Sequence, residues 1–242
     1  MLAEQKIVLI TGANRGLGLG LAKEYVSRGW KVIAAVRDPS IMPFLSEEVI
    51  VIKLDAAELN DANQAVNELK ERYEVQHIDV VLANAAMGNH APAISQIDPE
   101  IFTEHFNVNT RGTLLLYQAT RELLLSSSSS SIKGKFIIVS SILSTLSRSW
   151  HKLGMVNYGI TKVALNYLSK GIHFEEPNLI SFTIDPGYVD TRLGQKASEF
   201  LNSPPSQTVE QTAPMMCDLI DKATREEYSG KLWRVDGTPA PY

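Results

Sequence analysis

A tyrosine and a lysine four residues apart are the side chains in this sequence best suited to acid–base chemistry. Tyr158 and Lys162 stand at positions i and i+4, so a helix would carry both side chains on one face. A free phenol has a pKa of about 10, too high for efficient proton exchange at neutral pH. A fixed cation beside the phenol favours the phenolate and lowers that pKa. The spacing therefore predicts that Tyr158 is a general acid and that Lys162 adjusts its pKa.

A glycine-rich segment predicts a site for phosphate groups. Residues 11–18 read Thr-Gly-Ala-Asn-Arg-Gly-Leu-Gly and join the apolar run 6–10 to a helical pattern. Glycines at such a turn let the backbone bend tightly and approach a pyrophosphate, while the helix N-terminus presents free N–H groups. The turn therefore predicts a dinucleotide-binding unit.

The residues after the second apolar run indicate which dinucleotide is bound. Arg37 follows the run 31–36, and Arg15 lies in the glycine turn, so two cations could meet a ribose 2′-phosphate. Asp38 is the counterargument, because a carboxylate there could bind the ribose hydroxyls of NAD. We predict NADP(H) as the cofactor, with NAD(H) as the alternative.

Apolar runs alternate with helical patterns along the chain. Strands are expected at residues 6–10, 31–36, 49–52, 78–83, 135–139, 179–184 and 231–235. Helices are expected at 17–26, 59–75, 99–125, 157–173 and 208–223, and the serine run 126–131 is expected to be a solvated loop. Strands that are apolar throughout are buried on both faces, and their alternation with helices is typical of a parallel sheet. The pattern predicts an α/β protein: one Rossmann-fold domain over residues 1–242, a doubly wound seven-stranded parallel sheet with helices on both faces.

Composition excludes several classes of function. The 242 residues include 23 Lys and Arg against 27 Asp and Glu, and the net charge of −4 gives no basic excess for nucleic-acid binding. Cys217 is the one cysteine, and the five histidines show no metal-ligand spacing. No apolar stretch is long enough to cross a membrane or to serve as a signal peptide. We expect a cytoplasmic protein with no metal, no nucleic-acid partner and no membrane partner.

Several motifs, taken in order, carry a resemblance to a known family. They are the glycine turn, Asn84-Ala85-Ala86, Asn109, Ser140-Ser141, the pair Tyr158 and Lys162, and residues 185–191 (Asp-Pro-Gly-Tyr-Val-Asp-Thr). Together they resemble the short-chain dehydrogenase/reductase family along essentially the whole chain. Residues 81–87, 185–191 and 236–237 are most similar to fungal ketoreductases related to norsolorinic acid ketoreductase and to small carbonyl reductases.

The resemblance implies roles for four catalytic residues. Tyr158 would donate a proton to the carbonyl of the substrate, and Lys162 would bind the nicotinamide ribose and lower the pKa of Tyr158. Ser141 would hydrogen-bond the carbonyl oxygen. Asn109 would kink its helix and hold a water that relays protons to Lys162.

The resemblance also implies a set of residues that contact the dinucleotide. Asp55 would meet the adenine amine, Asn84 the adenosine ribose region, and Val189 and Thr191 the carboxamide. The full set is Gly12, Asn14, Arg15, Gly16, Leu17, Gly18, Arg37, Asp55, Asn84, Ala85, Ala86, Tyr158, Lys162, Pro186, Gly187, Val189 and Thr191.

Two departures from the family pattern bear on these expectations. Met87 stands where the family has a glycine, so the local backbone could differ. Ser141 and Tyr158 are 17 residues apart, a longer interval than the commonest one, so Ser140 and Ser144 are alternatives for the serine. We favour Ser141, because it is the second of a serine pair just past a predicted strand.

The loops after three strands are expected to hold the substrate. They span residues 87–95, 142–156 and 188–205 and contain Met87, His90, Leu143, Leu146, Trp150, His151, Leu153, Met155, Tyr188 and Leu193. Such loops suit an apolar or aromatic carbonyl compound. The resemblance implies an NADPH-dependent ketoreductase or carbonyl reductase; the alternatives are an NAD-dependent secondary-alcohol dehydrogenase and a non-catalytic NADP(H)-binding protein. Members of the family commonly pair through the helices expected here at 99–125 and 157–173, which implies a homodimer or homotetramer.

Overall fold

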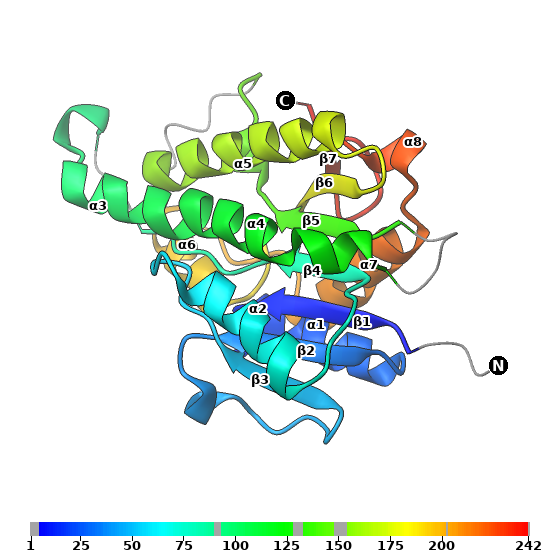
Figure 1. The fold of residues 1–242 in the computed structure, drawn as a ribbon. Helices are drawn as coiled ribbons and strands as arrows, with labels where there is room; N and C mark the ends of the chain where they lie inside the picture. Colours follow the sequence, from blue (N-terminus) through cyan, green and yellow to red (C-terminus); the bar gives the residue numbers. More distant parts are fainter. Residues whose placement is uncertain (1–4, 90–92, 128–132, 148–153, 202, 242) are drawn as a thin grey trace.

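Seven short apolar segments form one parallel sheet, which confirms the predicted fold class (Figure 1). The structure, a computed structural model, describes residues 5–89, 93–127, 133–147, 154–201 and 203–241. The strands are β1 (Ile7–Thr11), β2 (Lys31–Val36), β3 (Val49–Lys53), β4 (Val80–Ala83), β5 (Lys135–Val139), β6 (Ile180–Asp185) and β7 (Leu232–Arg234). Their order is β3-β2-β1-β4-β5-β6-β7, and every neighbouring pair is parallel. The order reverses between β1 and β4, the place where ligands of open α/β sheets bind.

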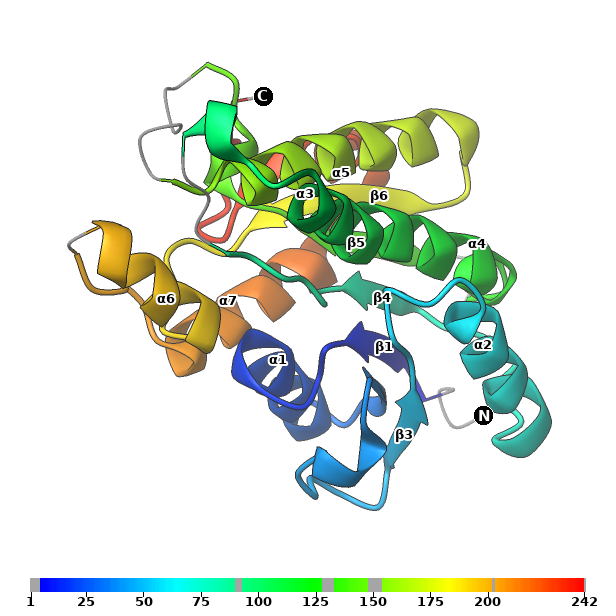
Figure 2. The same cartoon turned by 90° about the vertical axis from the view of Figure 1, so that its left-hand side faces the viewer.

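Helices cover both faces of this sheet (Figure 2). One face carries α1 (Gly16–Ser27) and α7 (Val209–Lys222), and the other carries α2 (Asp61–Arg72), α4 (Gly112–Leu125) and α5 (Val156–Glu175). Each face has its own apolar core, because strand side chains alternate between the two sides. Leu21 and Ile220 lie in the first core, and Leu69, Leu116 and Leu165 lie in the second.

The helical region predicted at 99–125 consists of three parts. It begins with α3 (Pro99–His105), where the Asp98 carboxylate accepts a hydrogen bond from Glu100 N at 2.8 Å. Residues Phe106–Arg111 then form a π-helix, and α4 follows directly. A π-helical turn inside an α-helix is rare and is frequent at functional sites. The widened turn contains Asn109, which is fully buried.

The expectation of a loop at 188–205 was wrong, because part of it forms α6 (Arg192–Leu201). The sequence pattern does not indicate this helix, because Gly194 lies within it and glycine is a poor helix former. Glycine is required at this position, since a Cβ there would lie 2.1 Å from the Val189 carbonyl oxygen. The short helix α8 (Arg225–Tyr228) was also missed. The predicted loop residues His90, Trp150, His151 and Leu153, and most of the serine run, lie outside the described residues. Within the part of the chain that the structure describes, no helix is long and apolar enough to span a membrane.

Candidate active site

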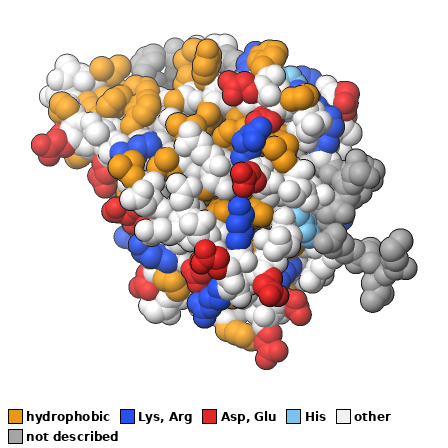
Figure 3. All heavy atoms as spheres, in the orientation of Figure 1, with side chains coloured by type: hydrophobic (Ala, Val, Ile, Leu, Met, Phe, Trp, Pro, Cys, Tyr) orange, Lys and Arg blue, Asp and Glu red, His pale blue; other side chains and the backbone are white. Residues whose placement is uncertain are grey.

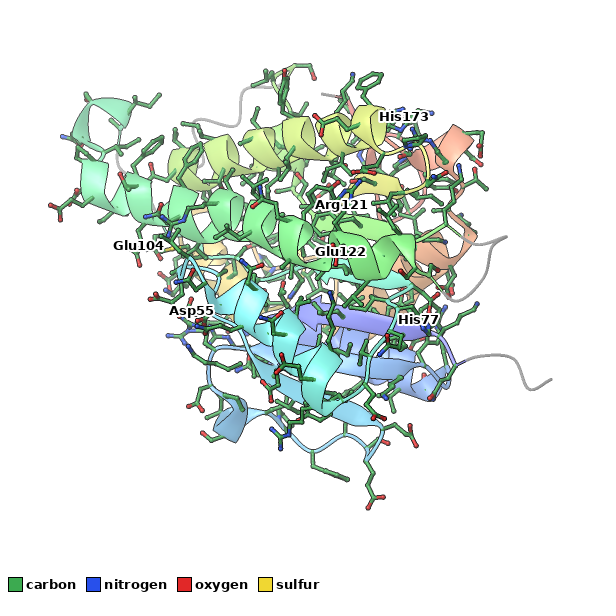
Figure 4. The ribbon with its side chains drawn as sticks, in the orientation of Figure 1. Asp55, His77, Glu104, Arg121, Glu122 and His173 are labelled. Atoms are coloured by element: carbon green, nitrogen blue, oxygen red, sulfur yellow. The ribbon has the colours of Figure 1, made fainter. Side chains whose placement is uncertain are left out.

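The predicted site residues follow the carboxyl ends of four neighbouring strands. The glycine turn follows β1, Asn84 follows β4, Ser141 follows β5 and Pro186 follows β6. Because parallel strands end at one edge of a sheet, these segments lie together at the edge that faces the viewer in Figure 2. Asp55 lies on this side of the molecule, whereas His77 and His173 lie on the opposite side (Figure 4). Among the described residues no three His, Cys, Asp or Glu side chains form a group that could hold a metal.

The glycine turn forms a tight cradle at the start of α1. Gly12 has a φ of +68°, and a Cβ on Gly18 would lie 2.2 Å from the Gly12 carbonyl oxygen, so both positions require glycine. The Asn84 amide fixes the turn by donating to the Thr11 carbonyl at 2.8 Å. The first N–H groups of α1 have no side-chain cap, because Arg15 stands at the N-cap position. The turn therefore fits an anion such as a phosphate.

The charged side chains beside this cradle differ in whether they already have hydrogen-bond or ion-pair partners within the protein. The Asp38 carboxylate accepts hydrogen bonds from Ser40 N at 3.0 Å and from Ser40 Oγ at 2.6 Å, and these bonds hold its pKa below the ordinary value. Arg15 and Arg37 are exposed, and neither guanidinium has a hydrogen bond or ion pair within the described residues. Two cations are thus available to an anion here, while the carboxylate has local partners.

Asp55 lies just beyond β3 and is held by its own turn. One carboxylate oxygen accepts a hydrogen bond from Ala57 N at 3.0 Å. Its backbone N–H donates to the Asp61 carboxylate at 2.9 Å, and Asp61 pairs with Lys53 at 2.9 Å. Asp55 is half-buried, and its second carboxylate oxygen has no hydrogen bond among the described residues, so it is available to a donor.

Tyr158 and Lys162 lie on α5 and are both buried. The Lys162 ammonium donates to the Val139 carbonyl at 2.7 Å and lies 5.2 Å from the centre of the Tyr158 ring. Burial lowers the pKa of Lys162 to about 7. Burial, together with the nearby Asp185 carboxylate, raises the pKa of Tyr158. The pKa of the phenol thus lies above its ordinary value, where the sequence predicts a value below it; burial is the largest cause, and the Lys162 ammonium is directed at a backbone carbonyl.

The three candidate serines differ in whether the hydroxyl hydrogen already has an acceptor within the protein. Ser140 and Ser144 are buried: Ser140 Oγ donates to Asn166 Oδ1 at 2.8 Å, and Ser144 Oγ donates to the Ser141 carbonyl at 2.6 Å. Ser141 is half-buried, and its Oγ accepts a hydrogen bond from Leu143 N at 3.2 Å. Among the described residues its own hydroxyl hydrogen has no protein acceptor, so Ser141 is the serine that can donate to a ligand.

Asn109 holds the segment that follows β4. Its Oδ1 accepts from Met87 N at 2.8 Å, and its Nδ2 donates to the Met87 carbonyl at 2.9 Å and to Thr161 Oγ1 at 3.0 Å. Both amide hydrogens therefore have protein partners. The irregular helix expected at Asn109 takes the form of the π-helix, and the water relay stays a prediction.

The segment after β6 closes the site against the glycine turn. Gly187 has a φ of +79° and its N–H donates to the Asp185 carboxylate at 3.2 Å. Thr191 N donates to the Val189 carbonyl at 2.8 Å, and a Cβ on Gly16 would lie 3.4 Å from Thr191 Cγ2. The two turns thus lie side by side.

Three residues missed by sequence reasoning contribute to the site. Thr11 Oγ1 accepts the N–H groups of Asn84 and Ala85, each at 3.0 Å, and its place at the end of β1 was a usable signal. A Cβ on Gly88 would lie 2.8 Å from Leu193 Cδ1 and 3.1 Å from Tyr158 Cδ2, so Gly88 lies against the phenol ring. Asn166, the third, contacts the buried serines.

Known proteins with a related sequence are oxidoreductases. Norsolorinic acid ketoreductase of Dothistroma septosporum is 37% identical over 97% of this chain and 91% of its own length. Norsolorinic acid ketoreductase of Aspergillus parasiticus is 32% identical over 99% of this chain and 92% of its own length.

Two solved structures share the fold. NADPH-bound carbonyl reductase from chicken fatty liver superposes with a TM-score of 0.83 at 22% identity, covering 99% of this chain and all of the other. Carbonyl reductase Sniffer of D. melanogaster superposes with a TM-score of 0.86 at 21% identity over the same shares. A family model described as short chain dehydrogenase matches residues 6–202. On its sequence and its fold, this chain belongs to the short-chain dehydrogenase/reductase family of oxidoreductases.

Proposed function

We propose that this protein reduces the carbonyl group of a ketone or aldehyde with NADPH. The observation that carries the proposal is a pair of hydrogen-bond donors at one edge of the sheet. The Tyr158 phenol is protonated at neutral pH, since a free phenol has a pKa of about 10 and burial raises the pKa of this one further, and the Ser141 hydroxyl hydrogen has no protein acceptor among the described residues. Two such donors suit one carbonyl oxygen on which negative charge develops.

The residues around the glycine turn fit a nicotinamide dinucleotide. The cradle of Gly12, Gly16 and Gly18 would hold the pyrophosphate, and Arg15 and Arg37 would meet a 2′-phosphate. When bound, the reduced cofactor supplies the hydride that adds to the carbonyl carbon. The chicken carbonyl reductase, which shares the fold, is NADPH-bound, and this supports the choice of cofactor.

The side chains of this protein supply position and protons. Ser141 and Tyr158 donate hydrogen bonds to the substrate oxygen, and Tyr158 then transfers its proton to that oxygen to give the alcohol. The Lys162 ammonium stabilises the phenolate that remains until it regains a proton from solvent. Asn109 keeps Met87, and with it the wall of the site after β4, in place.

We infer that the substrate is an apolar or aromatic carbonyl compound. Carbon atoms of three side chains meet at Gly88: a Cβ there would lie 2.8 Å from Leu193 Cδ1, 3.1 Å from Tyr158 Cδ2 and 3.5 Å from Met155 Cε. An aromatic ketone would bury its rings there. The curated relatives reported above are ketoreductases named for norsolorinic acid, which supports this class.

A second copy of the chain is the partner we propose. Ile160, Tyr167 and Phe174 recur every seven residues on α5 and are exposed, Tyr167 by 82% and Phe174 by 72%. Figure 3 shows hydrophobic side chains gathered over the part of this face where α3, α4 and α5 lie. An exposed apolar stripe of this kind marks a protein interface, and a homodimer would cover it. Whether the dimer pairs again to a tetramer, and a cytoplasmic location, stay predictions.

The purified protein tests the proposal directly. We expect consumption of NADPH with aromatic ketones and diketones, measured as loss of NADPH absorbance, and slower consumption with NADH. No turnover across such a panel with either cofactor would overturn the proposal. Faster oxidation of secondary alcohols with NAD would favour the dehydrogenase alternative instead.

A further inference from the structure

A buried amide lies one helical turn beyond the tyrosine and lysine of α5. Tyr158, Lys162 and Asn166 stand at positions i, i+4 and i+8, so their side chains leave the helix on one face. All three are buried, and the mechanism above uses only the first two. Asn166 points to the turn that carries Ser141, not to solvent.

Asn166 is the centre of a closed set of hydrogen bonds. Its Oδ1 accepts from Ser140 Oγ at 2.8 Å, and its Nδ2 donates to Ser144 Oγ at 2.8 Å. Ser144 Oγ in turn donates to the Ser141 carbonyl at 2.6 Å. The two serine side chains are 3.3 Å apart, and both residues are almost completely buried. The amide thereby connects α5 to the residues on both sides of Ser141.

This connection fixes the direction of the hydrogen bonds. A serine hydroxyl has one hydrogen to donate. Ser140 donates its hydrogen to Asn166 Oδ1, and Ser144 donates its hydrogen to the Ser141 carbonyl. The Ser141 carbonyl is then held by Ser144, through Oγ at 2.6 Å and N at 3.0 Å, and the preceding residue Ser140 is held by Asn166. The Ser141 hydroxyl itself accepts from Leu143 N and keeps its hydrogen for a ligand. Without the amide, Ser140 Oγ and Ser144 Oγ keep each other as partners at 3.3 Å, but the turn loses the side-chain hydrogen bonds that connect it to Asn166 on α5.

We propose that Asn166 is a positioning residue that sets the Ser141 hydroxyl relative to the Tyr158 phenol. The proposal rests on the function proposed above, because it requires both groups to act on one carbonyl oxygen. One rigid helix then supplies the proton donor, the cation and the amide that places the second donor. A displacement of about 1 Å in such a group can cost roughly 100-fold in rate.

Variants on both sides of the connection test the proposal. Asn166→Leu removes the amide at similar volume, and Ser144→Ala removes only the hydroxyl that donates to the Ser141 carbonyl. We expect either variant to lower kcat roughly 10- to 100-fold while the Kd for NADPH, measured by fluorescence of the bound cofactor, changes less than about twofold. Ser169→Ala is the matched control, because it removes a buried hydrogen bond from α5 to Ser181, 3.1 Å away, outside the serine turn. The control should keep kcat even if its melting temperature falls.

A double-mutant cycle with Ser141→Ala separates positioning from general stability. Ser141→Ala alone should lower kcat roughly 100-fold, as loss of one oxyanion donor does. In that background Asn166→Leu should cause less than about a twofold further loss, because there is no hydroxyl left to position. If the two losses multiply, or if Asn166→Leu and Ser144→Ala keep the wild-type kcat, the positioning role is wrong and the proposed function stands. If Ser141→Ala keeps the wild-type kcat, the role of Ser141 and the proposal fall together.

Discussion

Replacement of Lys162 by methionine should make the protein more stable and remove its activity. Lys162 places an ammonium in a fully buried position, where its one protein hydrogen bond among the described residues goes to the Val139 carbonyl. Methionine has a similar length and no charge, so it removes the cost of desolvation and keeps most of the packing. A group kept at such a cost acts in the function of the protein more than in its stability.

The magnitude follows from the pKa of Lys162. Burial lowers this pKa from 10.5 to about 7, and at about 1.4 kcal/mol per pKa unit the shift corresponds to roughly 5 kcal/mol near neutral pH. The variant also leaves the Val139 carbonyl without its hydrogen bond, which costs about 1–3 kcal/mol. We expect the free energy of unfolding of Lys162→Met to exceed that of the wild type by roughly 2–4 kcal/mol near neutral pH.

The lowered pKa of Lys162 also determines how the stability difference between the wild type and Lys162→Met changes with pH. Between about pH 7 and pH 10.5 the folded protein binds fewer protons at Lys162 than the unfolded chain does. The free energy of unfolding of the wild type therefore increases as the pH rises through that window. The variant has no titrating group at this position, so its free energy of unfolding lacks this increase. The advantage of Lys162→Met should shrink as the pH rises and reverse by about pH 10, where most of the desolvation cost is gone and the lost hydrogen bond outweighs the rest.

Urea denaturation followed by circular dichroism measures the difference in free energy of unfolding between the two proteins, and repeating it at several pH values in this window measures its pH dependence. Lys23→Met is the control, because Lys23 is an exposed lysine in the helix α1 and should change stability by less than about 0.5 kcal/mol at every pH. A Lys162→Met variant that is less stable than the wild type near neutral pH, or a difference that does not change with pH, would refute the reasoning.

Four further predictions use the same structure. Arg37→Ala should raise the KM for NADPH roughly 10-fold or more and that for NADH less than about threefold; equal changes would contradict contact with a 2′-phosphate. Gly88→Ala should lower kcat/KM for a bulky aromatic ketone, and Leu193→Ala should restore part of it, because the added Cβ would lie 2.8 Å from the Leu193 side chain. kcat/KM for reduction should fall as the pH rises through about 7, where Lys162 loses its proton; a flat profile there would count against its charged role. Tyr167→Glu should yield a monomer by light scattering if the stripe on α5 is the dimer interface.

The sheet could be predicted because its strands are continuous apolar runs with little polar interruption. Residues 31–36 and 135–139 were expected as strands and form β2 and β5 with the same ends. Such runs do not depend on distant contacts for their identification. The helix α6 could not be predicted in this way, because Gly194 lowers the helix propensity of the segment. Glycine is required there by the close approach of the Val189 carbonyl, which the sequence does not show.

The details of the site depend on contacts between distant residues. The sequence left three serines as candidates, and they are distinguished only once Asn166, 26 residues after Ser140, is seen to occupy Ser140 and Ser144. The direction of the Tyr158 pKa was missed for a similar reason. Spacing shows that Lys162 is near, but not that the phenol is buried beside Asp185 or that the ammonium is directed at Val139.

The central claim is that Tyr158 gives the proton that completes reduction of a carbonyl group. The most direct measurement compares steady-state NADPH consumption by the wild type and Tyr158→Phe with one aromatic ketone, together with the Kd for NADPH. Phenylalanine keeps the ring and removes the hydroxyl, so kcat should fall roughly 100- to 10,000-fold while the Kd changes little. A Tyr158→Phe variant that binds NADPH normally and turns over at the wild-type rate would contradict the account.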